Sequence, residues 1–307
     1  MLVGMMELAD VADSKSAGSD TVRVQVPLPA PSVKSQPCIS RLAFLFSKRE
    51  IKASMQQSTI PESCRFEQLS KTLLLAVTKE HTFGSDAFLL ADFAGKGLRH
   101  KDLAVDLGTG CGIIAFLLYK NMRPKEMWGV DIQKLAIEQF KLSLEQSAAM
   151  GEPLDGILKP ICSDLKDLKG KLPFGTFDLV TCNPPYKTCG TGILSSLPSH
   201  QIARHEVMCS LDDVCHTASS LLKTGGRFCL CLRPERLCDI LCSMRANRLE
   251  PKRAQFVARD DHTQPWLVLV EGKKDAKPYM DILPTLIFDT KTAAKITHYG
   301  DYEKEEA

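Results

Sequence analysis

The chain has 307 residues, of which 44% are hydrophobic and 25% charged, and its formal net charge at pH 7 is +2. This composition is typical of globular proteins and gives no chain-wide basic character that would point to nucleic acid. No apolar run approaches the roughly 18 residues of a membrane-spanning helix. The acidic residues near the N-terminus are unlike the cationic start of a secretory or transit signal. We therefore expect a cytoplasmic protein with no membrane partner.

The N-terminal 54 residues differ from the rest of the chain. Ser, Ala, Asp and Pro dominate residues 11–37, and no amphipathic period is sustained there. The apolar run LAFLF (42–46) is the one candidate for local order in this stretch. We expect residues 1–54 to be a disordered extension or no part of the mature protein, with a second possible start at Met55. The folded domain is expected over residues 55–307.

Strand-like and helix-like segments alternate from Met55 onward. Short apolar runs bounded by Gly, Asn or charge predict buried strands at 103–108, 127–132, 177–183 and 227–232, with one more before ICSDLKD (161–167). Apolar residues spaced by three and four predict helices at 111–120, 133–149 and 211–222. The alternation indicates an α/β fold with a doubly wound, mostly parallel sheet. Two further strands, 253–258 and 265–272, are joined by a turn too short for a crossover, so the last of these strands should be antiparallel.

The first predicted strand runs into a glycine-rich turn, DLGTGCG, that opens a helix. Ligands of such sheets bind at the carboxyl ends of the strands, so this turn is the expected cofactor site. Gly108, Gly110 and Gly112 form GxGxG, and the GxGxxG of dinucleotide folds fails at Ile113. Asp106 would repel a pyrophosphate but suits a ligand with an ammonium group. These features favour S-adenosylmethionine, which has an amino acid end, a sulfonium and no phosphate.

Two more acids follow successive strands. Asp131 ends the second strand, where its carboxylate could accept both ribose hydroxyls, and Asp164 could meet the adenine edge. Taken singly, each acid could equally be a helix cap or a solvated turn residue. Their order after successive strands favours a cofactor site.

The strand at 177–183 ends in Asn183-Pro184-Pro185-Tyr186, which gives up two backbone donors. The Asn183 side-chain oxygen and the Pro184 carbonyl could each accept one N–H of an exocyclic amine and aim its lone pair at a methyl group. Tyr186 offers a face on which an extruded base could stack. The structural alternative is a tight turn with the tyrosine as a lid on the core.

DLGTGCG and NPPY together resemble class I methyltransferases that modify planar amide or amine nitrogens. FGSDAFLLADF (83–93), IARHE (202–206), LRPERL (232–237), LEPKRAQFV (249–257) and the terminal YGDYEKE narrow the resemblance to the bacterial tRNA-valine adenine(37)-N6-methyltransferase family. The resemblance covers about residues 82–305 and implies a seven-stranded Rossmann-like sheet with an antiparallel last strand. It also implies a catalytic loop and a set of cofactor-binding residues, the latter being Phe83, Asp86, Asp106, Gly108, Gly110, Asp131, Ile132 and Asp164. The catalytic loop would be Asn183, Pro184, Pro185 and Tyr186.

A basic stretch supports an RNA substrate, which the resemblance implies to be tRNA. Nine Lys or Arg against three Asp or Glu lie between Lys223 and Arg259, although such a run is often only a solvated face. Candidate contacts to RNA are Arg204, His205, Arg233, Arg236, Lys252 and Arg253, with Arg245 and Arg248 as further cations of the same stretch. His205 is interpreted as a hydrogen-bonding residue of the loop and not as a general base.

The twelve cysteines include no CxxC pair, and most of those in the folded part lie in or beside apolar runs, where a thiol acts as a small hydrophobe. Spacings typical of structural zinc are absent, so we expect no metal. Three rival functions remain: a glutamine-N5 methyltransferase of release factors, a guanine-N2 methyltransferase of ribosomal RNA, and a catalytically idle RNA-binding subunit. An idle copy would be expected to lose its glycine turn or its NPPY.

Overall fold

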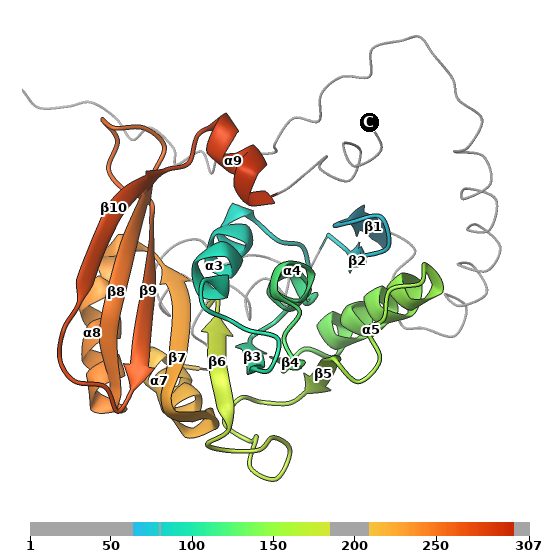
Figure 1. Cartoon of the computed structure of the whole chain (residues 1–307), viewed down its shortest axis with the longest axis horizontal. Coiled ribbons are helices and arrows are strands. Elements are labelled where there is room, and N and C mark those ends of the chain that lie inside the picture. The colour runs from blue at the N-terminus through green and yellow to red at the C-terminus, as the bar shows by residue number, and fades with distance from the viewer. Residues whose placement is uncertain (1–63, 80, 185–208, 298–307) are drawn as a thin grey trace, which may run out of the picture. The chain divides into compact units, whose positions relative to one another are not determined.

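The computed structural model describes residues 64–79, 81–184 and 209–297 (Figure 1). The predicted boundary between residues 54 and 55 lies outside these ranges, as do Pro185, Tyr186, Arg204 and His205, so the expectations about them stay predictions. No helix in the described ranges is long and apolar enough to cross a membrane.

The centre of the fold is an eight-stranded sheet with the order β10-β8-β9-β7-β6-β3-β4-β5. Five neighbouring strands are parallel, and β9 is inserted antiparallel between β7 and β8. The strands are β3 (Leu103–Leu107), β4 (Glu126–Asp131), β5 (Leu158–Cys162), β6 (Phe177–Cys182), β7 (Leu222–Leu232), β8 (Leu249–Ala258), β9 (Leu267–Lys274) and β10 (Asp281–Ile287).

Helices cover both faces of the sheet, each with its own hydrophobic core. One core joins Ala104, Leu179 and Cys229 to the apolar sides of α3 (Ser85–Gly95) and α4 (Ile113–Met122). The other joins Val105, Val180 and several more strand residues to α7 (Leu211–Leu221) and α8 (Leu237–Ala246). Alternate strand residues therefore feed opposite cores, which is the packing of a doubly wound sheet (Figure 1).

The remaining elements lie around this sheet. A two-stranded antiparallel hairpin of β1 (Arg65–Gln68) and β2 (Leu74–Val77) packs on α5 (Lys134–Ala149). Buried serines of α5 bind the backbone of β2: Ser143 accepts the Ala76 N–H at 2.8 Å and Ser147 accepts that of Leu74 at 2.9 Å. A 3₁₀ turn, η1 (Pro234–Arg236), follows β7, and α9 (Thr290–Thr297) follows β10.

The predicted α/β class, the parallel strands and the antiparallel strand at 265–272 are confirmed. The strand count and the place of the last strand need correction, because β10 adds an eighth strand at the edge, parallel to β8. The predicted helix at 211–222 ends at Leu221, because Leu222 is the first residue of β7.

The C-terminal turn of α3 is held by arginines from distant strands. Arg227 of β7 donates to the carbonyls of Ala94 and Lys96, and Arg253 of β8 donates to that of Phe93 at 2.9 Å. Both guanidinium groups also pair with the buried Glu271 of β9, at 3.0 and 2.8 Å. These contacts satisfy carbonyls that a helix end leaves without partners, since α3 has no basic residue in its own last turn.

Candidate active site

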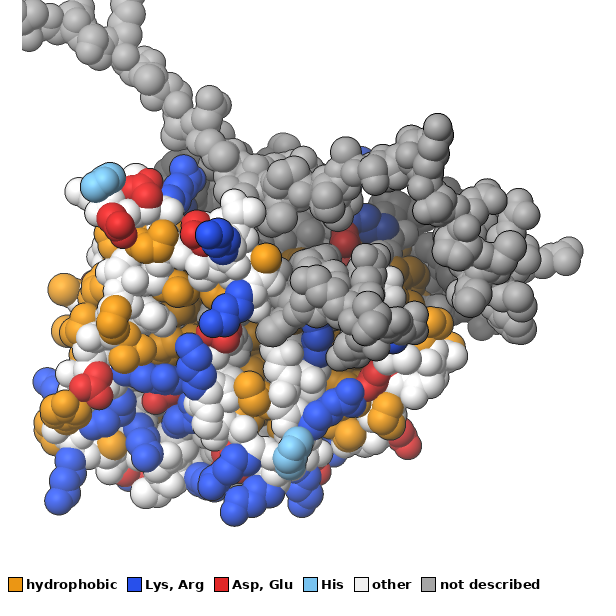
Figure 2. All heavy atoms as spheres, turned by 45° about the horizontal axis from the view of Figure 1, so that its top comes forward, with side chains coloured by type: hydrophobic (Ala, Val, Ile, Leu, Met, Phe, Trp, Pro, Cys, Tyr) orange, Lys and Arg blue, Asp and Glu red, His pale blue; other side chains and the backbone are white. Residues whose placement is uncertain are grey.

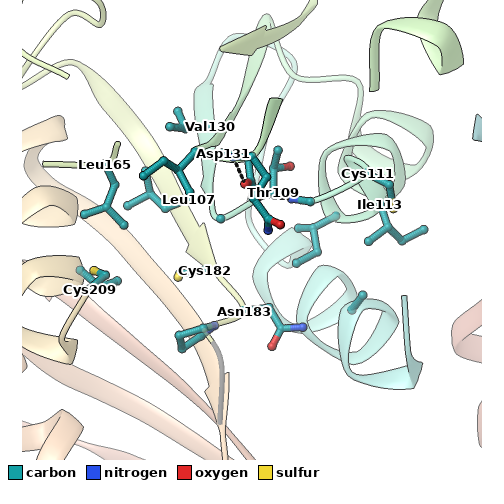
Figure 3. A pocket seen from close by; sticks show the side chains of 18 of the residues that line it. Leu107, Thr109, Cys111, Ile113, Val130, Asp131, Leu165, Cys182, Asn183 and Cys209 are labelled. Carbon is teal, nitrogen blue, oxygen red and sulfur yellow. Dashed lines mark hydrogen bonds between the residues drawn. The ribbon is translucent and has the colours of Figure 1, made fainter. Parts of the chain in front are cut away.

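A cavity of about 310 Å³ opens at the carboxyl ends of β3, β4 and β6 (Figure 3). This is where ligands of open parallel sheets bind. Asp131 and Thr109 lie on one side of the cavity and Asn183 on the other (Figure 3). The N-terminal ends of α3 and α7 complete its wall, with Phe83, Gly84 and Asp86 from the first and Ser210, Leu211 and Val214 from the second.

The glycine-rich turn forms the floor beside β3. Gly108 and Gly110 have φ of 70° and 56°, a region that favours glycine, and a Cβ added at either would meet nothing within 4 Å. The N–H groups of Gly108 and Thr109 both donate to the Val130 carbonyl at 2.9 Å, which fixes the turn against β4. The turn therefore presents open space on its cavity side that side chains would have narrowed.

The third glycine of GxGxG serves packing instead. A Cβ on Gly112 would lie 2.7 Å from the Phe140 ring, and one on Gly129 would lie 2.4 Å from it. Both positions must be glycine for α5 to dock its phenylalanine under the turn.

Asp131, at the end of β4, holds the turn through its carboxylate. Its Oδ2 accepts the Gly110 N–H and its Oδ1 accepts the Gln133 N–H, both at 2.8 Å. Burial raises the pKa of Asp131 against the lowering effect of these N–H groups, with a further lowering by the nearby His81. Each carboxylate oxygen has a second lone pair, so the group can still accept hydroxyls from a ligand.

Asp106 lies beneath the turn and does not line the cavity, contrary to a direct role in binding. Its Oδ1 accepts the Thr181 hydroxyl of β6 at 2.7 Å, and the Thr109 hydroxyl of the turn also interacts with this carboxyl. Burial raises the pKa of Asp106 to about 7, against the lowering effect of the two hydroxyls.

Asp164 and Ile132 line the adjoining wall. Asp164 accepts the Lys166 N–H at 2.9 Å in a local turn, which is the alternative that the sequence offered, and its contact with the adenine stays a prediction. Ile132 is an exposed apolar side chain, with 39% of its surface accessible. An exposed isoleucine beside a carboxylate suits a flat ring such as adenine.

Asn183 stands at the end of β6, held by side chains from two distant elements. Its Nδ2 donates to Oδ2 of Asp86 at 3.1 Å, and its Oδ1 accepts the Cys231 thiol at 3.1 Å. Pro184 follows it in the cavity wall, and Phe83 lines the cavity while its ring meets Phe88 edge-on at 5.7 Å. The amide thus reaches the cavity in a fixed orientation.

Of the predicted catalytic and cofactor-binding residues that the structure describes, all but Asp106 line this cavity. Those that line the cavity are Phe83, Asp86, Gly108, Gly110, Asp131, Ile132, Asp164, Asn183 and Pro184. Sequence reasoning missed further lining residues, which include His81, Thr109, Ser163, Cys182 and Cys209. Thr109 and Ser163 follow predicted strands, Cys182 lies at the end of one, and Cys209 precedes a predicted helix. Those positions were the available signal, and His81 had none.

The predicted cationic surface is divided between two ends of the sheet. Arg233 follows β7 at the catalytic end, where it donates to the Trp266 carbonyl at 3.0 Å, and Arg236 pairs with Asp239. Arg245, Arg248 and Lys252 lie near the opposite end, where Leu249 pairs with Lys274. Basic side chains in the space-filling view form several groups with apolar and acidic side chains between them (Figure 2).

Arg253 pairs with Glu271 and donates to the Phe93 carbonyl at the end of α3. The geometry therefore gives no support to the prediction that Arg253 contacts RNA. Arg245 pairs with Glu250 and Arg248 with Asp275. The basic stretch is one run in the sequence but not one surface, because α8 carries the chain from the end of β7 back to the start of β8 at the opposite end of the sheet.

The architecture and this site together are those of a methyltransferase. Residues 80–236 match the family described as "Methyltransferase small domain", and the chain belongs to that family. It is 28% identical over 218 residues to a tRNA1(Val) (adenine(37)-N6)-methyltransferase of Porphyromonas gingivalis, covering 65% of this chain and 79% of the relative. It is 29% identical over 96 residues to the rRNA N(6)-adenosine-methyltransferase metl-5 of Caenorhabditis elegans, covering 31% of this chain and 40% of that protein.

A solved structure of a predicted O-methyltransferase, protein Atu636 from Agrobacterium tumefaciens, shares the fold. It superposes with a TM-score of 0.52 at 20% identity, covering 67% of this chain and 88% of that one.

The cofactor of this family, S-adenosylmethionine, fits the residues present. The open space over Gly108 and Gly110 admits a ligand against the backbone of the turn. Asp131 offers acceptors for ribose hydroxyls, and Ile132 an apolar surface for adenine. No group of three or more His, Cys, Asp or Glu within the described ranges could hold a metal ion.

Proposed function

We propose that the protein methylates the exocyclic N6 of an adenine in RNA, with tRNA near the anticodon as the substrate and the cytoplasm as its location. The observation that carries the proposal is the Asn183 amide, which two side chains hold at the cavity directly before Pro184. The relatives in P. gingivalis and C. elegans, both named as adenine-N6 methyltransferases of RNA, support it.

The chemistry requires acceptors for the target amine. The lone pair of an adenine amine is delocalised into the ring, so the nitrogen is a poor nucleophile. The Asn183 oxygen and the Pro184 carbonyl would each accept one of its N–H bonds and draw the nitrogen toward a tetrahedral shape. Because these dipoles are already oriented, they stabilise the transition state without reorganisation.

The chain's other residues bind and orient the reactants. When bound, S-adenosylmethionine supplies the methyl group from its sulfonium. Asp131 and the glycine turn would hold the cofactor, and the conformationally fixed prolines would keep the acceptors in place. We assign to Tyr186 the stacking of the extruded base, and to Arg204, His205, Arg233 and Arg236 contacts with the RNA.

Nucleoside mass spectrometry tests the substrate. Unmodified tRNA and rRNA are incubated separately with the protein and S-adenosylmethionine, digested, and analysed for N6-methyladenosine. We expect the modified nucleoside in the tRNA sample and none with the Asn183→Ala variant. N6-methyladenosine in the rRNA sample alone would instead indicate an rRNA substrate, as the name of the C. elegans relative states for that protein.

A release-factor protein incubated in parallel tests the nearest rival. N5-methylglutamine on that protein, with no methylated nucleoside in either RNA, would overturn the proposal. Binding of labelled S-adenosylmethionine without any methyl transfer would favour the idle subunit.

A further inference from the structure

We propose that Asp86 is a positioning residue that determines which end of the Asn183 amide faces the substrate, with Cys231 supporting the same orientation. The inference rests on the proposed function. Asp86 was predicted to contact the cofactor, whereas the structure places its Oδ2 on Nδ2 of Asn183, 97 residues away in the sequence.

A primary amide has a donor end and an acceptor end of almost the same shape. Rotation by half a turn exchanges the oxygen, which accepts, for the NH₂ group, which donates. The target amine must donate both of its N–H bonds, so only the orientation with the oxygen toward it is productive. A neighbouring group must therefore give the two orientations of the amide different free energies.

The Asp86 carboxylate makes them unequal because it only accepts. It receives the Asn183 N–H at 3.1 Å, and in the reversed amide it would face the carbonyl oxygen instead. Two acceptors at hydrogen-bonding distance repel each other and leave a polar group unpaired, which costs more than a hydrogen bond gains.

Cys231 acts on the other end of the amide. Its thiol, on the fully buried β7 position beside β6, donates to Oδ1 at 3.1 Å. A carbonyl oxygen can accept two hydrogen bonds, so this contact is compatible with a second one from the substrate amine. Asp86 and Cys231 therefore favour the same orientation of the amide, the first by accepting from its nitrogen and the second by donating to its oxygen.

The local backbone fixes the Asp86 carboxylate itself. Asp86 lies in the first turn of α3, where the helix dipole favours a negative group. Its Oδ1 accepts the Ala87 N–H at 3.0 Å. Gly84 leaves the required space, because a Cβ there would lie 2.7 Å from the same Oδ1.

The Asp86→Asn variant tests the inference, since it keeps the shape and removes the preference for a donor. Methylation is measured in single turnovers with saturating RNA and S-adenosylmethionine, together with the Kd of the cofactor and the Tm. We expect the rate to fall by about tenfold or more, as loss of a preorganised contact does. The cofactor Kd and the KM for RNA should change by less than about threefold, because the effect is on the transition state.

Two more variants complete the design. Gly84→Ala should displace the Asp86 carboxylate without altering either hydrogen-bonding group, and so lower the rate in the same pattern. It keeps the inference testable if Asp86→Asn does not fold. Asp92→Asn, on the same helix and in a partly exposed ion pair with Lys96, is the matched control and should retain the wild-type rate.

A rate for Asp86→Asn within about threefold of wild type overturns the inference, and so does a loss that higher cofactor concentration restores. The second result would make Asp86 a cofactor contact. Failure of the proposed function looks different: the wild-type protein would then yield a product other than N6-methyladenosine. The same variants measured on that product would still test the positioning of Asn183.

Discussion

The two sides of the cavity are built in different ways. On the cofactor side, Asp131 binds the backbone of Gly110 and of Gln133, within about one strand-turn-helix unit of the chain. On the substrate side, Asn183 is held by side chains 97 residues before it and 48 residues after it. The contacts of Asp131 join residues that are close in the sequence. The contacts of Asn183 join distant residues and form only when the whole sheet has assembled. The two sides should therefore respond differently to substitution.

Asn183→Ala is expected to have the largest effect of the changes considered. It removes an oriented acceptor that is used in the transition state, so the single-turnover rate should fall on the order of 100- to 1000-fold. The cofactor Kd, measured by calorimetry, should stay near the wild-type value. Equal losses of rate and of cofactor affinity would mean that the two sides of the cavity are one functional unit.

Asp106→Asn probes the buried acid beneath the cofactor side through pH. The folded-state pKa of about 7 exceeds the ordinary value of 3.8, so the folded protein binds more protons than the unfolded chain between these values. The contribution of Asp106 to the free energy of unfolding is therefore undiminished below about pH 4 and falls as pH rises toward 7. At about 1.4 kcal/mol for each pKa unit between 3.8 and about 7, the loss is on the order of 4 kcal/mol.

Urea unfolding of both proteins at several pH values checks this prediction. The stability of Asp106→Asn relative to wild type should increase from pH 4 to pH 7 and then level off. A difference independent of pH would show that the Asp106 pKa is not raised.

Asp131→Ala should weaken the cofactor side alone. Loss of hydrogen bonds to an ionised group typically costs about 1–3 kcal/mol, which calorimetry would record as a higher Kd for S-adenosylmethionine. At saturating cofactor, the methylation rate should recover to near wild type. A rate that stays low at saturation would extend the role of Asp131 across the cavity.

Asp164→Ala should have the smallest effect. Its carboxylate is partly exposed and already serves a turn, so we expect about 0.5–1 kcal/mol of lost cofactor affinity, the net worth of one hydrogen bond. Asp164→Asn, which can keep the turn, is the control. A larger loss from both variants would make Asp164 a principal contact of the adenine.

The sequence was informative wherever the signal was local. The buried strands, the glycine turn and the order of acids after successive strands were predicted because each depends on a few neighbouring residues. β10 was missed because its segment DILPTLI alternates poorly, contains a proline and is mostly exposed at the sheet edge. α3 shows little helical period, since it is buried on nearly every side.

The substrate side was predicted less completely for the same reason. Asn183 was recognisable from the residues that follow it, but no spacing links it to Asp86 or Cys231. Arg253 was misjudged in a similar way. A cation in a basic run resembles a surface residue, and only the fold shows that it faces Glu271 and Phe93.

The hydrogen bond from Arg253 to Phe93 joins residues 160 positions apart, and this separation bears on synthesis at the ribosome. Chains emerge N-terminus first and at a limited rate, so α3 leaves the ribosome long before β8 does. The Phe93 carbonyl therefore stays hydrated until Arg253 has been synthesised, although Arg227 is already present for the carbonyls of Ala94 and Lys96. We expect a nascent chain that ends before Leu249 to leave the Phe93 carbonyl uncapped, with the glycine turn and the side chains that orient Asn183 already synthesised. The end of the helix that carries Asp86 would thus be completed later in translation than the residues of the site itself.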